Sequence, residues 1–173
     1  MTWNEQFLTL FRHCVEQYRN GNADFMSHYT EDDLTFLKSI GYKPRELFDF
    51  VEDLVDQNAP SESTALLVAA VRRDYFLTIQ NGNRSDVEIG RDDLPSFGHD
   101  FDGIAYLPRI LKKAQAKLTG ELDPDMMFGC GGDRKFLRTH GDIHPADFLR
   151  HVWAADGDEQ KIVAYVREQS SLS

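Results

Sequence analysis

The fold of this chain is set by a short stretch that occurs twice, as DLTFLKSIG at residues 33–41 and as DRKFLRTHG at residues 133–141. After one added residue the likeness continues in five further pairs, namely Pro44 and Pro145, Glu46 and Asp147, Leu47 and Phe148, Phe48 and Leu149, and Val51 and Val152. A unit used twice indicates what the fold requires in both places. Residues that only one copy contains are therefore the first candidates for function.

Apolar residues recur along most of the chain at the three- and four-residue spacing of amphipathic helices. In both copies a glycine, Gly41 or Gly141, follows a short helical segment, and a proline, Pro44 or Pro145, opens the next one. Glycine is typical of helix ends and proline of helix starts. No segment has the convincing period of two that a strand would show. We therefore predict an all-α fold of about seven helices with little or no sheet.

The repeat predicts how these helices are organised. We expect one compact domain over residues 1–173 that contains two similar helix-turn-helix units, at about 1–60 and 104–173. Residues 61–103 would join them through a central, strongly apolar helix at about 64–80. The following run at 84–101 is rich in Gly, Asp, Ser and Pro, and a loop of that length is expected to be a structured connection.

Composition excludes several classes of partner. Nineteen basic against twenty-nine acidic side chains give a formal charge of −10, which would repel a phosphate backbone, so we predict no nucleic-acid partner. No apolar run approaches the roughly 20 residues that span a bilayer, and no targeting segment is visible, so a soluble cytoplasmic protein without a membrane partner is expected. The two cysteines, Cys14 and Cys130, are expected to be reduced, with Cys14 on the buried stripe of the first helix.

Three segments of the second half resemble a known family. They are GIAYLPR at 103–109, KAQAKL at 113–118 and GCGGDRKFL at 129–137. These segments are similar to the domain of unknown function 5069 family, and the resemblance covers roughly the last 70 residues most strongly. The resemblance implies which residues form a family signature, but it implies no activity and no catalytic residue.

The sharpest local feature is a glycine-rich loop made of Gly129, Cys130, Gly131, Gly132 and Asp133. Glycines before a helix leave backbone N–H groups free to approach an anion, and the positive helix end favours a thiolate. Cys130 would then be a nucleophile or a redox-sensitive thiol, with Asp133 and Arg134 at the helix start. The structural alternative is a tight turn in which Asp133 is the N-cap and Cys130 fills the core. Asp33 in the first copy favours that alternative for Asp133, whereas Cys130 has no counterpart there.

Arginines on apolar helices form the second group of candidates. Arg72, Arg73 and Arg109 must either find carboxylate partners or line a cleft that holds an anionic ligand. In the second case the cleft would lie between the two halves, with Tyr75 and Tyr106 as its walls.

Histidines suggest no metal site. His140, His144 and His151 do not have the spacing of zinc ligands, because Gly141 and Pro145 interrupt the helix between the first two. A cluster of His28 with Asp24 and Asp32 is better interpreted as loop solvation and helix capping. We therefore predict neither a metal nor a cofactor.

Two functional hypotheses remain open. The first is a module that binds a small molecule or a protein partner without chemistry, because no complete catalytic set is visible in the sequence. The alternative is an enzyme for a small anionic substrate, with Cys130 as nucleophile or redox thiol, Arg109 as anion holder and His28 or His140 as base.

Overall fold

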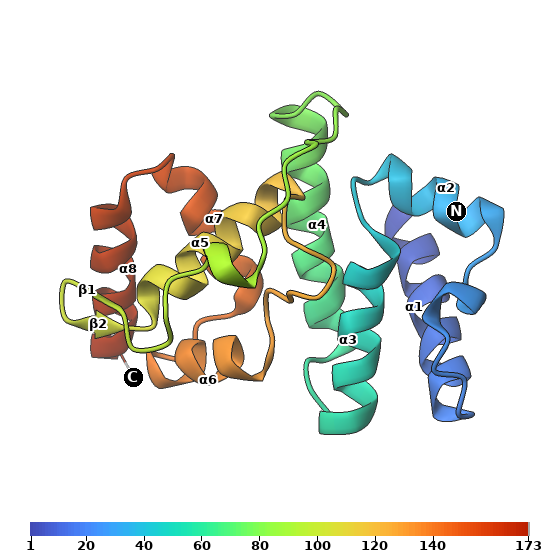
Figure 1. Ribbon diagram of the computed structural model, residues 1–173, viewed down its shortest axis with the longest axis horizontal. Helices are drawn as coiled ribbons and strands as arrows, with labels where there is room; N and C mark the ends of the chain where they lie inside the picture. Colours follow the sequence, from blue (N-terminus) through green and yellow to red (C-terminus); the bar gives the residue numbers. More distant parts are fainter. Residues whose placement is uncertain (173) are drawn as a thin grey trace. The chain divides into compact units, whose positions relative to one another are not determined.

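The computed structural model describes residues 1–172 and is mostly α-helical (Figure 1). The all-α fold class is therefore confirmed, although residues 1–172 contain eight α-helices where the sequence predicts about seven. The helices are α1 Trp3–Arg19, α2 Glu31–Ser39, α3 Pro44–Gln57, α4 Glu62–Thr78, α5 Leu107–Thr119, α6 Gly131–Thr139, α7 Pro145–Ala155 and α8 Glu159–Leu172. The smaller elements are the 3-10 turns η1 Phe25–His28 and η2 Arg91–Asp93 and the strands β1 Asp100–Phe101 and β2 Ile104–Ala105.

The chain divides into two compact units, Met1–Arg84 and Ser85–Ser173. Helices α1 to α4 form the first unit and α5 to α8 the second. The apolar helix α4, expected at the centre of the chain, belongs to the first unit, and Leu67 and Leu77 on it are exposed. Among residues 1–172, no helix combines the length and the apolar character that crossing a membrane requires.

An aromatic core holds the first unit together. Helix α1 packs against both α3 and α4. Phe7 stacks on Phe11 with ring centroids 6.3 Å apart and meets Tyr42 edge-on at 5.9 Å. Phe48 on α3 is also fully packed, against Tyr18 and Phe25. Aromatic side chains bury large areas, and these rings pack in the core together with aliphatic side chains such as Leu37, Leu47 and Val51.

The second unit is built around α5 and α7. Helix α7 packs against α5 and α8, and the short antiparallel hairpin β1–β2 lies on α5. An ion pair of 2.9 Å between Arg167 on α8 and Asp102 in the hairpin turn fastens the hairpin to α8. Phe128 and Phe148 stack in the interior at 6.5 Å.

The two sequence copies have similar local structure, with one more residue in the turn of the second copy. Helices α2 and α6 each have nine residues, and each is followed by a glycine with positive φ, +71° at Gly41 and +91° at Gly141. A backbone hydrogen bond closes the turn in each unit. Tyr42 N–H donates to Leu37 O at 2.9 Å, and Ile143 N–H donates to Leu137 O at 3.0 Å. A proline then starts the next helix in both units.

The connection that follows α4 is ordered by pairing with the second unit. Ile89 N–H donates to Glu121 O at 2.7 Å, and Asp123 N–H donates to Ile89 O at 3.0 Å. These bonds form a single parallel bridge between Ile89 and Leu122. Most of the segment at 84–101 therefore belongs to the second unit instead of linking two units freely.

Candidate functional site

Helices α5 and α6 bring a lysine, a cysteine, an aspartate and a tyrosine together in the second unit. Lys113 on α5 is only 2% exposed, and its Nζ donates to Cys130 Sγ at 3.2 Å and to Asp133 Oδ2 at 2.6 Å. Cys130 itself is half-buried, in contrast to the fully buried Cys14. We call Tyr106, Lys113, Cys130 and Asp133 the Cys130 cluster.

Asp133 is the electrostatic centre of this cluster. Its side chain is fully buried and accepts three hydrogen bonds. Besides Lys113, the donors are Gly129 N–H at 2.8 Å and the Tyr106 hydroxyl at 2.7 Å. A buried charge is tolerated when it is paired and fully hydrogen-bonded, and Asp133 meets both conditions. The carboxylate thus fixes the position of the Lys113 ammonium next to the Cys130 sulfur.

Tyr106 reaches Asp133 from an unusual backbone conformation. It is the residue before α5 and has φ +73°, a left-handed conformation that is uncommon for residues other than glycine. Burial first, and then the Asp133 carboxylate, raise the pKa of Tyr106, so its hydroxyl keeps its proton and donates to Asp133. The ring also packs on Phe136 of α6.

The first turn of α6 has no side-chain cap. Its N-cap, Cys130, makes no side-chain cap hydrogen bond, and the exposed Gly131 and Gly132 occupy the first two helical positions. Backbone N–H groups in a first helical turn have no partner within the helix. Gly132 also leaves room for Tyr106, because a Cβ there would lie 2.9 Å from the tyrosine hydroxyl. Cys130 Sγ therefore lies beside an uncapped, positively polarised helix end.

Asp133 is not the N-cap that the structural interpretation expected. Cys130 holds that place, and Asp133 is the third residue of α6. Asp33 is also third in its helix, where it accepts from the N–H and hydroxyl of the N-cap Thr30 at 2.9 and 2.6 Å. Both aspartates thus reach back to the chain before their helix, as the repeat suggests. Only Asp133 is fully buried and paired with a lysine.

The remaining candidates of the second unit support the loop and the tyrosine. Arg134 Nη1 donates to Gly129 O at 2.8 Å, which braces the glycine-rich loop. Arg109 is buried, donates to Pro95 O at 2.8 Å and lies 4.1 Å from the ring centroid of Phe97. Phe97 is exposed and stacks on Tyr106 at 6.1 Å. Arg109 therefore positions an aromatic residue next to the cluster.

The candidates of the first unit have structural partners. Arg72 is buried, donates to Gln80 at 2.8 Å and lies over Phe76, and burial lowers its pKa against the opposing influence of Glu46. Arg73 pairs with Asp74 at 3.1 Å. The arginines thus belong to different units, Arg72 and Arg73 to the first and Arg109 to the second.

Cys14 is fully buried, as predicted, and burial raises its pKa to about 12. His28 belongs to the same unit and is also buried, and its Nε2 lies at hydrogen-bond distance, 3.0 Å, from Asn22 O. Both residues are parts of the packed interior of the first unit, and neither belongs to the Cys130 cluster, which lies in the second.

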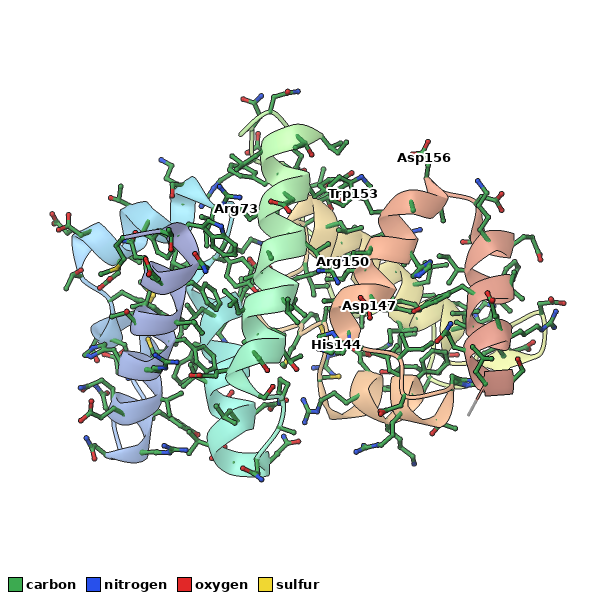
Figure 2. The ribbon with its side chains drawn as sticks, turned by 180° about the vertical axis from the view of Figure 1, so that it is seen from behind. Arg73, His144, Asp147, Arg150, Trp153 and Asp156 are labelled. Atoms are coloured by element: carbon green, nitrogen blue, oxygen red, sulfur yellow. The ribbon has the colours of Figure 1, made fainter. Side chains whose placement is uncertain are left out.

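The histidines of the second unit have separate roles. His140 packs on Phe136 at 4.4 Å, and burial lowers its pKa. His144 caps α7 by accepting from Ala146 N–H at 3.1 Å, and His151 stacks on Tyr165. Figure 2 shows His144 as the first of a row of labelled side chains that follow α7 through Asp147, Arg150 and Trp153 to Asp156. Among residues 1–172, no three His, Cys, Asp or Glu side chains are grouped as metal ligands would be.

Sequence reasoning missed Lys113, which holds the cluster together. A lysine is rarely buried unless it is paired, and the lysines of the KAQAKL segment were not among the site candidates. The spacing held a signal nonetheless. Lys113 and Lys117 fall on the same inward stripe as Ile110, Ala114 and Leu118, and both lysines are buried. A lysine on an apolar stripe requires a carboxylate partner, which the chain supplies twenty residues later at Asp133.

Comparison with protein-family models, curated proteins and solved structures finds no match to this chain. The resemblance of the second half to the domain of unknown function 5069 family stays a prediction. The function has to be inferred from the Cys130 cluster itself.

Proposed function

We propose that this protein is an enzyme that acts through the Cys130 thiol on a small anionic substrate held at the first turn of α6. The observation that carries the proposal is the hydrogen bond of 3.2 Å from the buried Lys113 ammonium to Cys130 Sγ. Cationic neighbours and helix N-terminal ends both stabilise a negatively charged sulfur, which is the nucleophilic form. Lys113 and α6 supply these two influences at one sulfur atom.

The proposed chemistry is addition of the thiolate to an electrophilic carbonyl carbon. The Sγ–C bond forms as the π electron pair of the C=O bond moves onto its oxygen. The N–H groups of Gly131 and Gly132 are available to stabilise that developing oxyanion. The thiol proton leaves to solvent, and Cys130 is only half-buried. An anionic group on the substrate would be attracted by the same helix end.

Asp133 and Tyr106 are positioning residues in this proposal. Asp133 holds Lys113 against Cys130, and Tyr106 holds Asp133 through its hydroxyl. The carboxylate also balances part of the lysine charge, so the pair introduces little net charge into the interior. Arg109 is proposed to act indirectly, by holding Phe97 beside Tyr106.

The repeat is proposed to be a duplication that left chemistry in one copy only. The matching lengths of α2 and α6, the glycine turns and the prolines support a shared ancestral unit. The contrast between the partly exposed Asp33 and the buried, lysine-paired Asp133 supports specialisation of the second unit. Two free cysteines support a reducing, cytoplasmic setting.

Alkylation of the folded protein by iodoacetamide tests the thiol. We expect Cys130 to be labelled faster at neutral pH than a free cysteine derivative, while the buried Cys14 stays unlabelled and serves as an internal control. A hydrogen bond to a charged group contributes about 1.5–3 kcal/mol, so Lys113→Met should slow labelling about tenfold or more. Peptide mass spectrometry over a range of pH gives both rates.

Two further variants keep this test decisive. Lys113→Met with Asp133→Asn removes both charges together, so slow labelling of this folded variant cannot be attributed to an unpaired buried carboxylate. Lys135→Met removes an exposed positive charge from α6 and should leave the rate unchanged. Labelling of Cys130 no faster than that of the free thiol would disprove the proposal. A ligand that Cys130→Ser still binds, without turnover by the wild type, would favour the binding module instead.

A further inference from the structure

A second site is suggested by a pocket of about 210 Å³ in the second unit, which Cys130 does not line. One wall is a face of α5 that carries Leu111, Lys112 and Gln115, and the hairpin contributes Asp100 and Phe101. His99 and Glu159, the first residue of α8, complete its polar rim. Pockets for drug-sized ligands have about 300–1,000 Å³, so this volume suits a small molecule.

The polar side chains of this pocket are not paired with one another. Within residues 1–172, no hydrogen bond or ion pair involves the side chains of His99, Lys112, Gln115 or Glu159. Asp100 uses one carboxylate oxygen to accept from Gly103 N–H at 3.0 Å. Opposite charges that line one pocket without neutralising each other are available to a ligand that carries both signs.

The lining defines the chemistry of that ligand. Asp100 and Glu159 bring two negative charges, which favour an amine on the ligand. Lys112 brings one positive charge, which can pair with a carboxylate of the same ligand. Leu111 and Phe101 add an apolar surface to the lining, on which an aliphatic stem of the ligand can pack. We propose that this pocket binds a small zwitterion of the amino-acid type, with its amine on Asp100 and Glu159 and its carboxylate on Lys112.

A set of three matched probes tests the proposal on the intact chain. We expect 6-aminohexanoate to bind saturably with a Kd of about 1 mM or tighter, measured by ligand-observed NMR. Hexylamine lacks the carboxylate and hexanoate lacks the amine, so each should bind at least about fivefold more weakly. Binding should weaken with added salt, because the pocket is open to solvent and its charges are screened.

Variants place the binding at this pocket. Lys112→Met and Glu159→Gln should each raise the Kd several-fold, whereas Lys161→Met, an exposed lysine on α8 outside the lining, should not. Cys130→Ser should bind like the wild type, which separates this site from the thiol. The proposal is overturned if 6-aminohexanoate does not bind, if hexylamine or hexanoate binds as tightly, or if neither pocket variant changes the Kd.

Discussion

Replacing Asp133 with alanine is expected to destabilise the second unit by about 3–5 kcal/mol, the range measured when one partner of a buried ion pair is removed. The variant would leave the Lys113 ammonium, which is 2% exposed, without its carboxylate. It would also remove the acceptor of Gly129 N–H and of the Tyr106 hydroxyl. Each unsatisfied buried donor adds to the loss.

The chain offers a direct measurement of this effect. Its two tryptophans lie one in each unit, Trp3 in the first and Trp153 in the second. In a Trp3→Phe background, the fluorescence of Trp153 follows unfolding of the second unit in urea. The midpoint and slope then give the free energy of unfolding of that unit with and without Asp133.

The repeat supplies the matched control for Asp133→Ala. Asp33→Ala, observed through Trp3 in a Trp153→Phe background, removes only the bonds to Thr30 at a partly exposed helix start. Loss of such a cap costs about 0.5–2 kcal/mol. Equal losses for Asp33→Ala and Asp133→Ala would contradict the assignment of a buried charge network to the second unit. The double variant Lys113→Met, Asp133→Asn should lose less than Asp133→Ala, because it leaves no buried charge unpaired.

Features of this chain could be predicted from the sequence where they depend on residues close together in the chain, and could not where they depend on residues far apart. The bounds of α6 and α7 were nearly predictable, because the apolar period, Gly141 and Pro145 act within a few residues of the helix ends they define. The assembly of the Cys130 cluster was not, since the bond between Lys113 and Asp133 joins residues twenty apart on two helices. The sequence indicated Cys130, Tyr106 and Asp133 as separate candidates, but not the lysine that connects them.

The pocket of the second unit was hidden for a related reason. Lys112 and Glu159 are ordinary polar residues of exposed helix faces, and nothing local marks them as neighbours. The hairpin that completes the pocket consists of two-residue strands, too short to show a period of two. Only the tertiary structure places these side chains around one cavity.

Gly141→Ala is expected to destabilise the second unit by about 2–5 kcal/mol, the other large effect in this chain. Gly141 has φ +91°, where a residue with a Cβ loses about 1–2 kcal/mol. An added Cβ would also overlap the backbone carbonyl of Gln169 on α8. Crowding in a packed site adds about 1–3 kcal/mol, because backbone atoms cannot rotate away as a side chain can. Unfolding followed by Trp153 fluorescence gives the loss.

Gly157→Ala separates the two contributions. Gly157 also has positive φ, +84°, but a Cβ there would meet nothing within 4 Å, so the variant should lose only the conformational part, about 1–2 kcal/mol. The excess of Gly141→Ala over Gly157→Ala then measures how closely the glycine turn approaches α8. In the first unit a Cβ at Gly41 would overlap Phe76 on α4, and the overlapped atoms include the Cβ of Phe76, which cannot rotate away from its helix. Gly41→Ala should therefore lose about as much as Gly141→Ala, and a loss at Gly141 no greater than at Gly157 would contradict close packing of the turn on α8.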